Sequence, residues 1–329
     1  MRDLQFTVLV SYLDQVDAVR DTVGAIIEAL APFPKSEVLL VDNGSTDGSH
    51  AILDELAGRH PKFRWVLEER RGVYYARRRG LLDARSELCI FIDDDAVPTD
   101  AFFEEILEVW TSDPKIGVVG GRVELDPSVQ VPTWVPQRLL SQFAVWEGGR
   151  QTGVEDAIFP ILPTGVALAV RRGRCTELWC GDRRAQNYPL GRRKADPGRG
   201  VAGSDLGGEE SDLCLVFMRS GYRVLFAHDA RARLRVPVER LRPGWFIGRF
   251  GSEGRTRIRL LRLAGLNPMG RFGRHIIWAW PLLALVLPIA MVIAPKQALV
   301  VRAYLAKSWH AFGEWAFGPR YQPFPYRAD

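Results

Sequence analysis

Three consecutive aspartates, Asp93, Asp94 and Asp95, directly follow the apolar run LCIFI. A helix cap needs only one carboxylate, so the mutual repulsion of these side chains must be offset by something positive. Hard oxygen ligands gathered at one point suit Mg²⁺ or Mn²⁺ together with substrate phosphates. On an extended segment Asp93 and Asp95 face the same side and form the natural metal pair, with Asp94 turned toward the protein or the substrate. The structural alternative is an acidic turn that holds a water or a lysine.

Asp42 ends a second apolar run, VLLVD, and opens the turn sequence DNGSTD. Its carboxylate could simply cap the helix that follows. It could equally accept hydrogen bonds from a nucleobase or a ribose, as strand-end acids do in dinucleotide sites. Asp42 together with the later aspartates supports a nucleotide site more strongly than Asp42 alone.

The predicted elements that position these acids alternate between strands and helices. Apolar runs at 6–10, 38–41, 63–67, 88–92 and 116–123 predict strands, and helical spacing follows at 16–30, 52–56 and 73–84. Short connections between them predict an α/β fold with a mostly parallel, Rossmann-like sheet and helices on both faces. Ligands of such sheets bind beyond the carboxyl ends of the strands, so Asp42 and Asp93 should share one crevice.

A second acidic group lies late in the chain. The stretch 183–208 is rich in Gly, Arg and Asp and has little periodicity, which is typical of a functional or disordered loop. It leads into Glu209 and Glu210 and then an apolar helix over 213–218. Without further information, both glutamates could be first-turn acids favoured by the helix dipole.

Composition sets broad limits. The chain has 329 residues, is 47% hydrophobic and carries a net charge of +5, which indicates a folded protein large enough for one domain and an appendage. Twelve arginines and no lysine lie between Arg231 and Arg274, which suits anionic partners or a solvated basic face. The four cysteines have no metal-finger spacing, and the first apolar run is too short for a signal peptide, so we expect buried thiols in a reducing compartment.

Residues 276–295 carry no charge and have arginines before them and Lys296 after them. About 20 apolar residues match one bilayer crossing. Pro281 and Pro288 interrupt the stretch, so a re-entrant or interfacial helical hairpin is the alternative to a single span. Membrane contact through 275–295 is predicted in either case.

Six ordered blocks resemble the family 2 glycosyltransferases over residues 5 to about 226: VLVSYLDQ, LLVDNGSTDGS, ERRGVYYARRRGLLDA, LCIFIDDDAVP, LPTGVALAVRR and GGEESDLCLVFMRSGYRV. The order and spacing of the set are specific, although no single block is. The resemblance implies a GT-A fold and transfer of a sugar from a nucleotide-sugar donor.

The resemblance also implies roles for individual residues. Donor contacts fall on Ser11, Tyr12, Asp42, Arg77, Asp93 and Asp94. Asp93 and Asp95 become the DxD pair for a divalent metal, Mg or Mn, and Gly165 and Asp212 lie in the acceptor region. Glu210 would be the general base that deprotonates the acceptor hydroxyl, with Glu209 as the fallback.

Two positions depart from the family pattern. Arg78 stands where many relatives have asparagine, and Leu234 and Arg235 stand where a metal-binding histidine is common. His228 is near but out of register. Metal dependence is therefore less secure than the aspartates alone indicate, and Arg235 could neutralise phosphate charge directly.

These observations predict a GT-A catalytic domain over 1–230, with a nucleotide half to about 125 and an acceptor half to 230. A basic helical region over 231–274 and a hydrophobic helical segment over 275–329 follow. We expect an inverting transferase at the cytoplasmic face of a membrane that acts on a glycan or lipid-linked acceptor, with no nucleic-acid partner. The alternative is an inactive GT-A-like scaffold that binds a glycan or lipid. A nucleotidyltransferase would not explain the acidic pair before the late helix.

Overall fold

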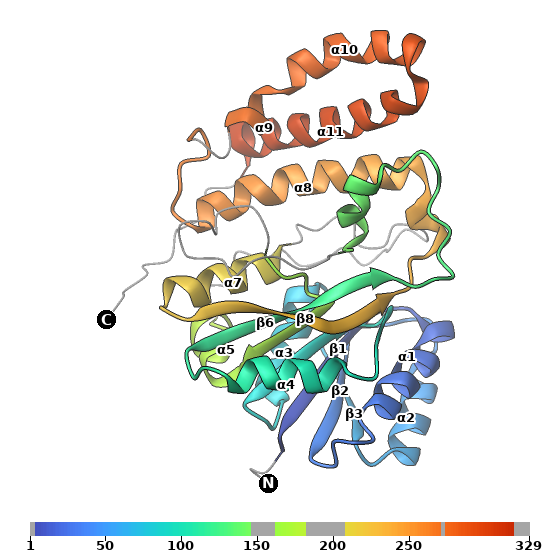
Figure 1. Cartoon of the computed structure of the whole chain (residues 1–329), viewed down its shortest axis with the longest axis vertical. Helices are drawn as coiled ribbons and strands as arrows, with labels where there is room; N and C mark the ends of the chain where they lie inside the picture. Colours follow the sequence, from blue (N-terminus) through green and yellow to red (C-terminus); the bar gives the residue numbers. More distant parts are fainter. Residues whose placement is uncertain (1–3, 146–161, 182–207, 271–273, 319–329) are drawn as a thin grey trace.

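One mixed sheet organises the protein. The computed structural model describes residues 4–145, 162–181, 208–270 and 274–318. In this part of the chain the sheet has eight strands in the order β3-β2-β1-β4-β7-β6-β8-β5 (Figure 1). The strands are β1 (Phe6–Tyr12), β2 (Ser36–Asp42), β3 (Phe63–Leu67), β4 (Leu88–Asp93), β5 (Ala96–Pro98), β6 (Ile116–Leu125), β7 (Ala167–Arg171) and β8 (Arg223–Leu234).

The first four strands form the predicted parallel half of the sheet. Tyr12 is paired with Asp42, and Ser11 is paired with Asp93, so the carboxyl ends of β1, β2 and β4 meet at one edge. The shared position of Asp42 and Asp93 is therefore confirmed. The second half is mixed, because β7 runs antiparallel to both β4 and β6, whereas β6 and β8 are parallel.

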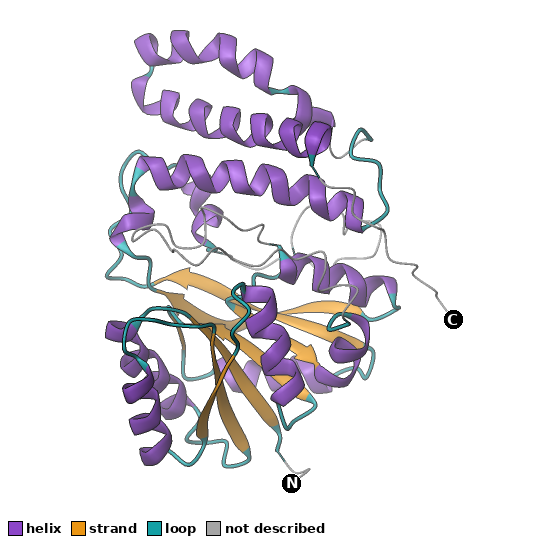
Figure 2. Cartoon of the chain, turned by 180° about the vertical axis from the view of Figure 1, so that it is seen from behind, coloured by secondary structure: helices purple, strands orange, loops and turns teal. Residues whose placement is uncertain are grey.

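Helices cover both faces of the sheet, as the alternating pattern predicts (Figure 2). Side chains of β1 alternate between two cores, with Val8 and Val10 in one and Leu9 in the other. The first core includes α1 (Val16–Ala29), α2 (His50–Arg59) and α4 (Phe102–Thr111). The second includes α3 (Val73–Asp83), α5 (Arg172–Leu178) and α7 (Glu209–Arg219).

β8 continues through residue 230 to Leu234, because its buried alternate residues run to that end. The segment 183–207 lies outside the described residues. All four cysteines are free and buried, as expected.

A C-terminal helical layer lies over one end of the sheet domain (Figure 1). It contains η2 (Val238–Leu241), α8 (Pro243–Leu263), α9 (Arg274–Trp278), α10 (Trp280–Ile293) and α11 (Pro295–Phe317), and η1 (Gln137–Phe143) packs on α8. α8 and α11 are in close contact, since a Cβ on Gly254 would lie 2.1 Å from the Lys307 carbonyl oxygen. α10 is the outermost helix in Figure 1.

The uncharged stretch 276–295 is divided between helices. Ala279 and Ala294 separate α9, α10 and α11, and α10 and α11 form a helical hairpin. Within the described ranges, no helix combines the length and the apolar character that crossing a membrane requires.

Candidate active site

Arg77, on α3, joins the two acidic groups that are far apart in the sequence. Its Nη2 donates to Asp93 Oδ1 at 3.0 Å, and its Nη1 donates to Glu209 Oε1 at 2.8 Å. Glu210 Oε2 lies 3.8 Å from the same Nη1. Burial alone would lower the pKa of Arg77, but Glu209, Asp93 and Glu210 raise it above its usual value. The strand-end acids and the helix-start acids therefore form one electrostatic network.

Gly165 creates the space for this arginine. A Cβ at Gly165 would lie 2.1 to 2.5 Å from the guanidinium atoms of Arg77, which is closer than any real contact. Gly165 precedes β7, the strand next to β4. The position predicted to lie near the acceptor thus contacts the centre of the site, and its glycine is required by packing.

Asp94 and Asp95 form the turn between β4 and β5, so the extended geometry assumed from the sequence ends at Asp93. Asp94 Oδ2 accepts a hydrogen bond from the Leu13 backbone N–H at 3.3 Å, which turns this carboxyl toward the protein. Burial raises the pKa of Asp94 well above its usual value, and Asp95 and Asp93 raise it further.

Arg240, in η2, donates to Asp95 Oδ2 at 2.9 Å. Burial raises the pKa of Asp95 to about 6, although Arg240 opposes the shift. Arg235, which the sequence suggested as the compensating cation, contacts Asp95 only through its backbone N–H, at 2.8 Å to Asp95 O. Its side chain lies 4.0 Å from Asp21 instead. The arginine side chain that contacts Asp95 is therefore that of Arg240, while Arg77 contacts Asp93.

The aspartate turn has the donor chemistry of a site for a hard divalent cation. Burial and mutual repulsion disfavour ionisation of Asp94 and Asp95, and a divalent cation would reverse that penalty. The contacts of Arg77 and Arg240 involve one oxygen each of Asp93 and Asp95. Among the described residues, no three His, Cys, Asp or Glu side chains are already grouped as a metal site. Leu234 is buried and has no side-chain donor atom, and His228 is exposed on β8.

The expected nucleotide-binding residues line the adjoining edge. Ser11 is half-buried, whereas Tyr12 is buried and its pKa is raised to about 12 by that burial. Asp42 is fully buried and accepts hydrogen bonds from the Ser45 backbone N–H at 3.1 Å and from His50 at 2.8 Å. The structure thus holds the Asp42 carboxylate within its own turn.

The three acids at the start of α7 have different surroundings. Glu209 is buried against Arg77, and Asp212 accepts a hydrogen bond from the Trp179 indole N–H at 3.1 Å. Glu210 keeps 23% of its side chain exposed. Burial raises the pKa of Glu210 to about 8, and the neighbouring Glu209 adds to this shift while Arg77 opposes it.

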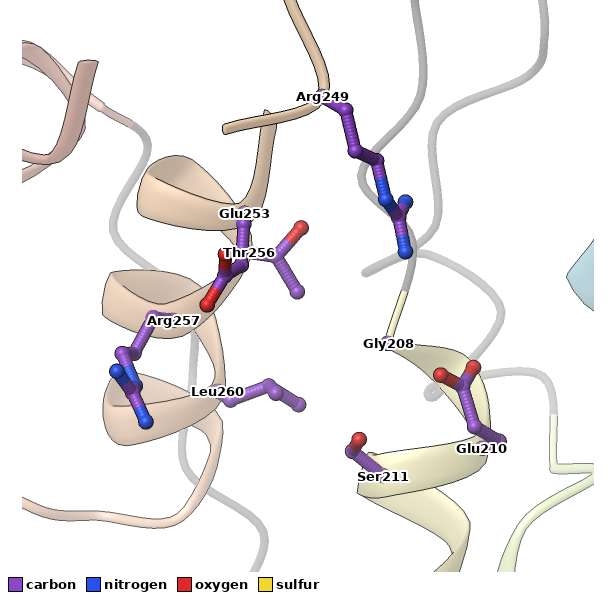
Figure 3. Close-up of a pocket in the computed structure, with 8 residues that line it drawn as sticks. All are labelled: Gly208, Glu210, Ser211, Arg249, Glu253, Thr256, Arg257 and Leu260. Carbon is purple, nitrogen blue, oxygen red and sulfur yellow. The ribbon is translucent and has the colours of Figure 1, made fainter. Parts of the chain in front are cut away.

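The sequence alone did not indicate three side chains that lie near the acids of the site. Arg240 contacts Asp95, and His50 contacts Asp42. Arg249 lines the same pocket as Glu210 (Figure 3). The arginine-rich stretch 231–274 contained the signal for two of them, but spacing alone does not show which arginines face the sheet. Arg78, noted as a departure, donates from Nε to the Cys180 carbonyl oxygen at 2.6 Å. Arg78 therefore ties α3 to the end of α5.

Comparison with solved structures identifies the fold that carries this site. The fold is similar to that of the mannosyltransferase PcManGT from Pyrobaculum calidifontis, solved in complex with GDP-Man and Mn²⁺. The TM-score is 0.62 at 19% identity, over 95% of this chain and 87% of that one, so the likeness concerns the fold. The protein has the GT-A glycosyltransferase fold.

Sequence comparison gives the family. Residues 7–164 match the family model described as glycosyl transferase family 2. Glycosyltransferase AglE of Haloferax volcanii is 28% identical over 119 residues, which are 36% of this chain and 39% of that protein. The glucosyl-dolichyl phosphate glucuronosyltransferase of the same organism is 20% identical over 247 residues, 74% of this chain and 72% of that protein. The chain contains a family 2 glycosyltransferase domain, as its ordered motifs predict.

Proposed function

We propose that the protein is an inverting glycosyltransferase that moves a sugar from a nucleotide-diphosphate donor to the hydroxyl of a glycan or lipid-linked acceptor. The observation that carries this proposal is the buried Arg77 guanidinium, which holds Asp93 on one side and the Glu209–Glu210 pair on the other. This arrangement brings together an acidic edge suited to a metal–diphosphate and a carboxyl suited to proton abstraction.

On the donor side, Asp93 and Asp95 would hold Mg²⁺ or Mn²⁺, and Ser11, Tyr12, Asp42 and Asp94 would shape the nucleotide site. The bound cation would neutralise the charge that develops on the departing diphosphate. Arg240 lies beside Asp95 and can exchange this partner for a phosphate oxygen once Asp95 binds a cation. The Mn²⁺ and GDP-Man of the mannosyltransferase complex support this choice of ligands.

On the acceptor side, Glu210 fits the general base better than Glu209. Glu209 is buried and hydrogen-bonded to Arg77, whereas Glu210 lines an open pocket. Glu210 would take the hydroxyl proton while the acceptor oxygen bonds to the anomeric carbon and the bond to the diphosphate breaks. Gly165 and Asp212 support this side, the first by admitting Arg77 and the second by fixing α7 to Trp179.

The test is a donor screen followed by two isosteric variants. Wild type is incubated with UDP- and GDP-sugars with and without Mn²⁺, and hydrolysis or transfer is measured. We expect Glu210→Gln to lower the transfer rate by ~10²–10⁴-fold with little change in donor affinity. Glu209→Gln is the matched control and should be milder. Equal rates for wild type and Glu210→Gln would remove Glu210 from the mechanism, and donor binding without any transfer by wild type would favour the inactive scaffold.

We also propose that α10 contacts a membrane, at its cytoplasmic face. None of the α10 side chains is buried, and large apolar ones are strongly exposed, including Leu285 at 73% and Val292 at 84%. At one end of the hairpin Trp278, Trp280 and Trp309 gather around Phe312, and tryptophan is enriched where proteins meet the bilayer interface. An interfacial helix of this kind would hold the acceptor side close to lipid-linked substrates.

A further inference from the structure

His50, the first residue of α2, contacts the Asp42 carboxylate at the carboxyl end of β2. Its Nε2 lies 2.8 Å from Asp42 Oδ2, and its ring stacks on Trp65 with the ring centroids 5.0 Å apart. Asp42 is fully buried, whereas 47% of the His50 side chain is exposed. A ligand at this end of the sheet therefore meets the imidazole before it meets the carboxylate.

The register of the sheet puts this pair where the base of a bound nucleotide would lie. Asp42 is paired with Tyr12 on β1, and Ser11 of the same strand is paired with Asp93 on β4. β2 and β4 are thus two strand spacings apart, about 10 Å, a gap that a ribose can bridge. In the other direction β4 adjoins β7, which Gly165 precedes on the acceptor side. With the diphosphate at Asp93, the base extends toward Asp42.

Asp42 also decides which nitrogen of His50 carries the hydrogen. A carboxylate only accepts hydrogen bonds, so the Nε2 that faces Asp42 is the donor. A neutral imidazole has one N–H, which leaves Nδ1 as an acceptor. Among the described residues, Nδ1 forms no hydrogen bond. Because one face of the ring is stacked on Trp65, Nδ1 is the polar atom that the ring has left for a ligand.

We propose that His50 selects the base of the nucleotide-sugar by accepting a hydrogen bond at Nδ1 from a ring N–H, with Asp42 as the residue that fixes this tautomer. The proposal rests on the function proposed above and narrows its nucleotide to one with a lactam base. Uracil, thymine and guanine carry a ring N–H beside a carbonyl, whereas cytosine and adenine have an acceptor nitrogen there. Two facing acceptors leave both atoms unsatisfied, so cytosine and adenine nucleotides should bind more weakly.

The experiment is calorimetry on the full-length protein with Mn²⁺ at pH 8, comparing UDP and GDP with CDP and ADP. The tighter of UDP and GDP should bind ~10- to 100-fold more tightly than CDP and ADP, and the two arms identify which lactam base the site takes. His50→Leu should reduce this preference to about twofold or less, because leucine has no acceptor. His60→Leu is the matched control at the other end of α2 and should keep the wild-type preference.

Asp42→Asn is the sharpest variant, because it keeps the shape of the side chain. The Ser45 backbone N–H lies 3.1 Å from Oδ1 and 3.3 Å from Oδ2, so the new amide should place its oxygen at Oδ1 and its NH₂ toward His50. Nε2 must then accept, the imidazole hydrogen moves to Nδ1, and the ratio of CDP to UDP affinity should rise about tenfold or more. A general loss of stability would instead weaken all four nucleotides together.

The outcomes separate base selection from catalysis. Equal binding of the four nucleotides by wild type, or tighter binding of CDP or ADP, overturns the proposal. An unchanged preference in either His50→Leu or Asp42→Asn also overturns it. Because binding is read without turnover, a base preference that depends on His50 in a protein with no transferase activity would overturn the proposed function alone.

Discussion

Two regions depart in opposite ways from the usual partition of side chains in a folded protein. Around Arg77 the protein buries charge, because the arginine and Glu209 are each about 5% exposed. On α10 it exposes apolar surface, because no residue of that helix is buried. Charged side chains are seldom buried without a partner, and contiguous apolar patches are seldom left in water. Without a compensating contact, each region would therefore lower the stability of the folded protein.

The difference indicates where each region obtains its compensation. The charges around Arg77 are compensated within the chain, through hydrogen bonds at 2.8 and 3.0 Å. On α10, Leu285 and Val292 remain 73% and 84% exposed in the described part of the chain, which fits the membrane contact proposed above. Mutation should therefore destabilise the first region and change only the associations of the second.

The largest effect is expected for Arg77→Leu. Removing the arginine leaves Glu209 buried and Asp93 half-buried without their shared partner, and breaking a buried ion pair in this way typically costs ~3–5 kcal/mol. Donor binding and transfer should both be lost, as measured by chemical denaturation and by the donor assay. Arg79→Leu is the matched control on the same helix, because Arg79 is 39% exposed in a surface pair with Asp83 worth ~0.3–0.5 kcal/mol. Equal destabilisation by the two variants would contradict the central role of Arg77.

Gly165→Ala should have the next largest effect. The added methyl group would overlap the Arg77 guanidinium, so the arginine must move away from Asp93 or Glu209. A displacement of ~1 Å at a catalytic constellation can cost ~10²-fold in rate. Gly58→Ala on α2 is the control, because nothing lies within 4 Å of its added Cβ. A wild-type rate in Gly165→Ala would show that the position of Arg77 is not critical.

The sequence was sufficient to predict the parallel half of the sheet, because strands such as 88–92 are short apolar runs with clear ends and the helices between the strands are periodic. It also predicted that Asp42 and Asp93 share an edge. It could not predict that Arg77 would connect Asp93 with Glu209, since this contact joins residues 132 positions apart and depends on the space at Gly165. Arg240 was missed for the same reason, because its partner Asp95 is 145 positions away.

A smaller effect is expected from pH. Burial raises the pKa of Glu210 to about 8, in surroundings that include Glu209, Arg77 and, from α8, Arg249, Glu253 and Arg257. A general base is active when deprotonated, so kcat/KM should rise about tenfold per pH unit below 8 and level off above it. The measurement is a pH profile of transfer for wild type and Glu210→Gln. A flat wild-type profile between pH 6 and 8 would contradict the assignment of Glu210 as the base.

The smallest effect on the folded protein, and the most selective, is expected on α10. Val292→Asp and Leu285→Asp replace side chains that are 84% and 73% exposed, so the melting temperature should hardly change. Burying an apolar side chain of this size in a bilayer interface contributes ~1.5–3 kcal/mol, so each variant should bind vesicles at least about tenfold more weakly. Vesicle binding is measured by sedimentation with phosphatidylglycerol–phosphatidylcholine vesicles.

The control is Leu82→Asp, which replaces a side chain on α3 that is 46% exposed. Equal sedimentation of all three variants would contradict membrane contact through α10. A change from dimer to monomer in the two α10 variants would instead identify a second copy of the chain as the partner that covers α10.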